Sequence, residues 1–151
     1  MNTSQCTTEQ VGGGRHRIDV RGRHELHADL PEHVGGSDSA PDSHDFFDTS
    51  LVVCKSLTAM WFARKNGIPL ERVSAQVERD DTEEHLGRYR LLVRIAFHGP
   101  LTDEQRKRLL AVVEKCPIAK LMTKSDVVIE LVAPEPVGRA ERPMTAQPSS
   151  R

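Results

Sequence analysis

The chain has 151 residues, a length that suits one domain, and its formal net charge is −1 at pH 7. With 37% hydrophobic and 28% charged residues, it has the composition of an ordinary soluble protein, and the balanced charge excludes the strongly basic class that binds nucleic acid or anionic membranes. No apolar run is long enough to span a bilayer, and the polar first residues do not resemble an export signal, so we expect a cytoplasmic protein.

The first 30 residues predict a leader followed by two strands. Residues 1–14 are polar and rich in glycine, which is typical of a mobile leader. Residues 15–30 hold two short pairs of alternating apolar residues with a glycine between them, and this pattern predicts a hairpin with one apolar face. Residues 32–41 are rich in Gly, Ser and Asp and predict a loop.

A long helix is predicted over residues 43–66. Ser43 and the neighbouring acids are start signals, and Asn66-Gly67 is a stop signal. Such a helix is about 36 Å long. Its apolar side chains cover most of its circumference: Phe46, Phe47, Leu51, Val52, Val53, Leu57, Met60, Trp61 and Phe62. A helix that is apolar nearly all round is normally buried, and this one is too long to bury in one small domain. We therefore expect it to pack against a second subunit.

The second half of the chain predicts strands and a short helix. Alternating apolar residues predict strands over 72–79 and 88–98. Thr102 and Gln105 form a capping-box pattern at the start of an amphipathic helix that continues to Cys116.

The remaining residues predict the end of the domain. Pro117 is expected to break the preceding helix, and residues 126–133 have the composition of a closing strand. Residues 134–151 hold four prolines and few apolar residues, which predicts a disordered tail. Antiparallel hairpins with separate helices place the fold in the α+β class.

Four features of the sequence belong together: the stretch from His24 to Pro31, Cys54 within the long helix, Gly99-Pro-Leu101, and Lys115-Cys116-Pro117, with the two cysteines 62 residues apart. With these features the chain resembles the OsmC/Ohr family of hydroperoxide-resistance proteins. The resemblance covers residues 15–133. The resemblance implies an intertwined homodimer in which antiparallel sheets wrap around the long central helices. It also implies thiol-dependent reduction of organic hydroperoxides at the subunit interface.

The resemblance gives the two cysteines separate roles. Cys54 would attack the peroxide as a thiolate and become a sulfenic acid, and Cys116 would resolve it as a disulfide. An external dithiol would then restore both thiols, and neither a cofactor nor a metal is required. The alternative is that both cysteines are simply small buried hydrophobic residues, as free cysteines often are.

The resemblance also implies supporting residues. In the peroxidase branch of the family, an arginine from the first strands lowers the pKa of the thiolate, and a glutamate ten residues before the first cysteine holds that arginine. Arg15 and Arg17 are both candidates for the arginine. His44 stands at the glutamate position, and Asp45 is a neighbouring acid.

The residues support one alternative function and argue against a metal site. The replacement of the glutamate by His44 favours a non-catalytic stress protein that binds a small hydrophobic molecule at the dimer interface. The seven histidines do not predict a metal site, because His24 and His27 on one strand would point to opposite faces.

Overall fold

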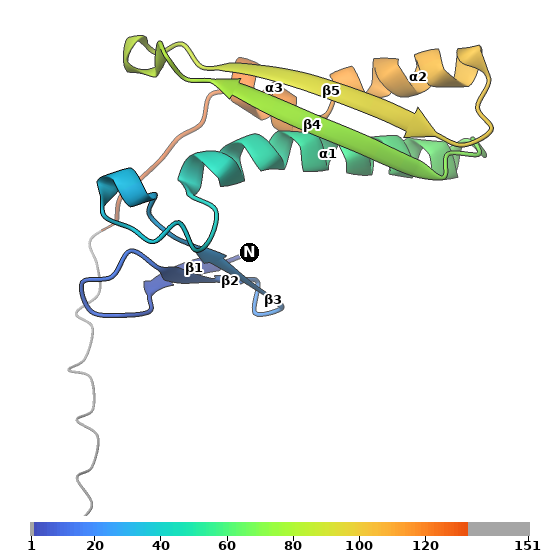
Figure 1. Ribbon diagram of the computed structural model, residues 1–151. Helices are drawn as coiled ribbons and strands as arrows, with labels where there is room; N and C mark the ends of the chain where they lie inside the picture. Colours follow the sequence, from blue (N-terminus) through green and yellow to red (C-terminus); the bar gives the residue numbers. More distant parts are fainter. Residues whose placement is uncertain (1, 133–151) are drawn as a thin grey trace, which may run out of the picture.

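The structure is a computed structural model that describes residues 2–132, and the tail predicted over 134–151 lies outside the described residues. Figure 1 shows the arrangement of its elements. The strands are β1 (Ser4–Thr8), β2 (His16–Val20), β3 (His24–Ala28), β4 (Arg72–Asp80) and β5 (Arg90–His98). The helices are α1 (Ser43–Lys65), α2 (Asp103–Glu114) and α3 (Pro117–Lys124), with 3-10 turns at Glu32–Val34 and Glu84–Leu86. The α+β class is confirmed.

The N-terminal sheet has three antiparallel strands in the order β1-β2-β3. The β2–β3 hairpin was predicted, but the mobile leader was not correct for residues 4–8, which form β1. All five residues of β1 are exposed and polar or small, so no apolar alternation marks them in the sequence. Backbone hydrogen bonds to β2 are what order them.

Helix α1 begins at a reciprocal cap. The Asp42 side chain accepts a hydrogen bond from the Asp45 backbone N–H at 2.9 Å, and the Asp45 side chain accepts one from the Asp42 N–H at 3.2 Å. Asp42 is therefore the capping residue, one position before the predicted Ser43, because its carboxylate satisfies an otherwise free N–H group of the first turn.

The core lies on one side of α1, where β4, β5 and α2 pack (Figure 1). Its fully or nearly fully buried residues are Ala59, Ala63, Ile68, Leu109 and Val113. The antiparallel β4–β5 pair runs from Arg72 opposite His98 to Asp80 opposite Arg90, so alternate side chains of both strands face the helices.

Among residues 2–132, nothing covers the opposite side of α1. Val53, Leu57 and Trp61 recur four residues apart on that side and are 48%, 64% and 59% exposed. The described residues of one chain therefore do not bury α1 on nearly all sides, as the sequence predicts for the assembled helix. In the part of the chain that the structure describes, no helix is long and apolar enough to cross a membrane.

The chain after α2 differs from its prediction in two ways. Pro117 does not end helical structure: it is the first residue of α3, where its fixed φ is favourable, and Cys116 is the N-cap. The described part of the predicted closing strand, 126–132, forms no strand, since no strand among the described residues pairs with it. Five of its apolar residues are largely exposed: Val127, Val128, Ile129, Leu131 and Val132.

Candidate functional site

The structure brings Cys54 and Cys116 together. Cys54 lies in the middle of α1 and is half-buried, whereas Cys116 lies between α2 and α3 and is 0% exposed. Both are free thiols. Their side chains are close enough for the Cys54 thiol to act on the pKa of Cys116. In this arrangement the half-buried Cys54 thiol can react with a molecule from solution, whereas the buried Cys116 thiol can react only with Cys54.

The surroundings of Cys116 have opposing effects on its acidity. Burial raises the pKa of the Cys116 thiol, and this is the largest effect. The Ala119 backbone N–H, which donates to Cys116 Sγ at 3.4 Å, lowers that pKa, as does the charge of Lys55, while the neighbouring Cys54 raises it. The net direction of the Cys116 pKa is upward, which favours the neutral thiol.

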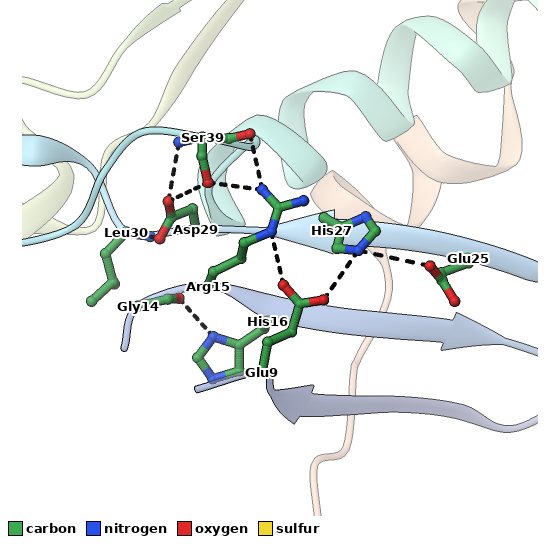
Figure 2. A network of polar contacts seen from close by, with 9 residues as sticks. All are labelled: Glu9, Gly14, Arg15, His16, Glu25, His27, Asp29, Leu30 and Ser39. Carbon is green, nitrogen blue, oxygen red and sulfur yellow. Dashed lines mark hydrogen bonds and ion pairs between the residues drawn. The ribbon is translucent and has the colours of Figure 1, made fainter. Parts of the chain in front are cut away.

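Of the candidate arginines, Arg15 directly precedes β2 and Arg17 lies on it. The N-terminal sheet lies away from the middle of α1 (Figure 1). Arg15 contacts Glu9 through Nε at 2.8 Å and Ser39 Oγ through Nη1 at 2.8 Å, as Figure 2 shows. Ser39 Oγ in turn donates to the buried Asp29 at 2.6 Å. Arg17 is exposed on β2. Within one chain, the structure therefore does not bring either arginine to Cys54.

His44 and Asp45 lie near the start of α1, two to three turns before Cys54. His44 Nε2 is 3.0 Å from Glu84 Oε1, and its ring stacks on Tyr89 with centroids 6.1 Å apart. The hydrogen bond with Glu84 raises the pKa of His44. The Asp45 side chain accepts the reciprocal hydrogen bond from the N-cap Asp42 and also contacts Arg79 Nη2 at 3.2 Å.

The sequence reasoning missed a polar network beside these residues. The buried Asp48 accepts a hydrogen bond from Tyr89 Oη at 2.8 Å, and Arg79 Nε lies 3.5 Å from its other oxygen. Burial, followed by the bond to Asp48, raises the pKa of Tyr89. The sequence signal that could have indicated this network is Asp48, an acid within an apolar helix. A buried carboxylate needs a charged or hydrogen-bonding partner. The arginine that the two acids of α1, Asp45 and Asp48, bind is therefore Arg79 of β4. The family resemblance implied an arginine from the first strands.

A mostly apolar cavity of about 920 Å³ lies between α1, β5 and α3. Helix α1 contributes Phe47, Leu51 and Lys55, β5 contributes Leu91, and α3 contributes Met122. The polar part of its lining includes the hydrogen-bonded pair His44 and Glu84. The cavity can accept an apolar molecule with a polar end. Among residues 2–132, no cluster of three or more His, Cys, Asp or Glu side chains is arranged to hold a metal ion.

Comparisons with known proteins point to one group. A family model described as OsmC-like protein matches residues 36–132, which is more than half of the 151-residue chain. A protein of Psychrobacter arcticus named for osmotic stress induction and detoxification response is 24% identical, with a TM-score of 0.69 over 82% of this chain and 90% of that one. No curated protein matches the sequence significantly.

Two similar structures are named for hydroperoxide resistance. The organic hydroperoxide resistance protein OsmC of Legionella pneumophila is 20% identical, with a TM-score of 0.57 over 82% of this chain and 90% of that one. The organic hydroperoxide resistance protein OhrB of Bacillus subtilis is 16% identical, with a TM-score of 0.54 over 82% and 91%. At these identities, the structures establish that the fold is shared.

Proposed function

Because this chain belongs to the OsmC-like protein family, we propose that it is a thiol peroxidase that reduces organic hydroperoxides. The observation that carries the proposal is the proximity of the Cys54 and Cys116 side chains, which come from separate elements of the fold. Family members include proteins named for organic hydroperoxide resistance, and this redox chemistry requires two thiols within reach of each other.

The burial of the two sulfurs supports separate roles in three steps. The half-buried Cys54, as thiolate, attacks one peroxide oxygen, releases the alcohol and becomes a sulfenic acid. The buried Cys116 thiol then attacks that sulfur, and water leaves as the disulfide forms. A dithiol reductant restores both thiols by exchange, in a reducing compartment such as the cytoplasm.

The cavity supports an organic substrate. Its walls are mostly apolar, and its volume of about 920 Å³ exceeds what hydrogen peroxide requires. The organic group of a hydroperoxide would lie against Leu51 and Leu91, and its peroxide end would reach the helix that carries Cys54. Burial of the organic group contributes binding free energy that hydrogen peroxide, which has no apolar group, cannot gain.

We place this site in a homodimer. Three surfaces of the described residues are ones that an isolated soluble chain rarely leaves open. They are the exposed side of α1, the exposed segment 126–132, and the β4–β5 sheet, whose edges no other strand within residues 2–132 pairs with. In such a dimer, Arg15 or Arg17 of a second copy is the cation that would lower the pKa of Cys54.

The proposal is tested by peroxide consumption. Cumene hydroperoxide and dithiothreitol are mixed with the wild type, Cys54→Ser, Cys116→Ser and, as a control, Cys6→Ser, which changes an exposed thiol in β1. We expect no turnover with Cys54→Ser, sulfenic acid and faster overoxidation with Cys116→Ser, and unchanged turnover with Cys6→Ser. Equal loss of turnover in all three variants, or none in any, contradicts the proposal.

A second candidate function is binding without catalysis. The contacts of Arg15 with Glu9 and Ser39, and the presence of His44 in place of the family glutamate, favour it. The chain would then hold a small hydrophobic molecule at the subunit interface. A fluorescent hydrophobic probe that binds wild type and Cys54→Ser equally, together with no peroxide consumption by either, would establish this function instead.

A further inference from the structure

Lys55 is anchored beside Cys116 by a shared contact. Its Nζ donates a hydrogen bond to the carbonyl oxygen of Val113 at 2.9 Å, and the backbone N–H of Cys116 donates to the same oxygen at 3.4 Å. This carbonyl lies in the last turn of α2, where the partial negative charge of a helix end favours an ammonium group. Lys55 also follows Cys54 directly in α1. One half-buried cation is therefore held close to Cys116.

The two sulfurs of a Cys54–Cys116 disulfide would differ in accessibility. Thiol–disulfide exchange requires the attacking thiolate to reach one sulfur while the other leaves. Cys116 is 0% exposed and is enclosed between α2 and α3, whereas Cys54 is half-buried. A dithiol from solution can reach Cys54, so the sulfur of Cys116 must leave.

Departure of Cys116 is chemically the harder direction. Burial raises the pKa of its thiol, and a sulfur whose thiol has a higher pKa leaves more slowly. Two groups oppose this effect at Cys116: the Ala119 N–H, which belongs to the backbone, and the ammonium group of Lys55. The side chain of Lys55 thus stabilises the negative charge that develops on Cys116 in this step.

We propose that Lys55 is a positioning residue for the reductive half of the cycle. Its ammonium group lies where the Cys116 thiolate leaves, and it thereby directs the reductant to Cys54. A thiolate of the dithiol bonds to Cys54 Sγ, the S–S bond breaks, and Cys116 takes the electron pair. The second thiol of the reductant then attacks its own mixed-disulfide sulfur, which releases Cys54 and leaves the reductant as a cyclic disulfide. This inference rests on the proposed function for its starting disulfide.

The test isolates the reductive step. Diamide oxidises the full-length protein without peroxide, the excess is removed, and dithiothreitol reduction is followed by stopped flow in wild type, Lys55→Met and Lys55→Arg. Lys115→Met is a matched control, because Lys115 precedes Cys116 directly but is exposed. We expect reduction to slow about tenfold in Lys55→Met, as for the loss of one charge-assisted contact, and to stay within about twofold of wild type in Lys55→Arg and Lys115→Met.

One further measurement completes the test. Glutathione added to the oxidised protein should be found by peptide mapping on Cys54. Glutathione on Cys116, an unchanged reduction rate in Lys55→Met, or equal slowing in Lys55→Arg would overturn the inference, and so would failure of diamide to join the two cysteines. If diamide joins them but peroxide is not consumed, the proposed function fails while the Lys55 measurement still decides this inference.

Discussion

Truncating Leu57 tests whether α1 is the centre of a dimer. Its side chain is 64% exposed in one chain, and full burial of a leucine contributes about 1.5–3 kcal/mol. Covering the remaining surface would therefore contribute about 1–2 kcal/mol per copy. A symmetric dimer buries Leu57 once in each copy, and alanine keeps the Cβ, so slightly less than twice this free energy is lost. Leu57→Ala should therefore weaken association by about 2–3 kcal/mol, or about 30- to 150-fold in Kd.

Sedimentation velocity over a concentration series measures this directly. The wild type should sediment at micromolar concentration as twice the 16.9 kDa chain, and Leu57→Ala should dissociate within the same range. Leu110→Ala is the control, because Leu110 is 48% exposed on α2, which packs on the other side of α1. A wild type that stays monomeric and folded, or equal weakening by both variants, would refute the dimer built on this face.

Three smaller predictions concern folding and titration. Asp42→Ala removes the N-cap of α1 and should lower the free energy of unfolding by about 1 kcal/mol in urea titration, so an unchanged midpoint would mean that the cap contributes nothing. Leu109→Ala empties a fully buried position and should cost about 3–5 kcal/mol by the same assay, whereas a loss under about 1 kcal/mol would contradict close packing there. Hydrogen bonding to Glu84 raises the pKa of His44 above its ordinary value of 6.5. The pair therefore stabilises the fold below pH 6.5, and this contribution is lost as the pH rises through the raised pKa. Glu84→Gln should lower the pKa of His44 in an NMR titration, and an unchanged pKa would argue against the pair.

The elements with strong local signals could be predicted from the sequence. The bounds of α1 follow from its start and stop signals, and the strand β5 follows from apolar alternation. Thr102 caps α2 through the predicted box with Gln105. Strand β1 could not be predicted, because its residues are ordered by backbone pairing alone. The apolar composition of 126–132 indicates a strand, but a strand also needs a partner, and composition does not say whether one chain supplies it.

The candidate site was predictable only in part. The positions of Cys54 and Cys116 follow from the family resemblance, and the fold does bring them together. The contacts of Asp48 with Arg79 and Tyr89 join three separate elements, so no local pattern indicates them. The bond from Lys55 to the Val113 carbonyl has no sequence signature either, because every residue carries a carbonyl group.

The cap of α3 makes the Ala119 amide a spectroscopic reporter. Its N–H donates to Cys116 Sγ at 3.4 Å, so the first turn of this helix is fastened by a weak acceptor whose electron density changes with the chemical state of the sulfur. A thiol, a thiolate and a disulfide sulfur differ as acceptors, so the chemical shift and exchange rate of this one amide hydrogen should differ among the three. A ¹⁵N-labelled sample followed at Ala119 would therefore record each redox turnover from within the backbone, without any added dye or substrate analogue.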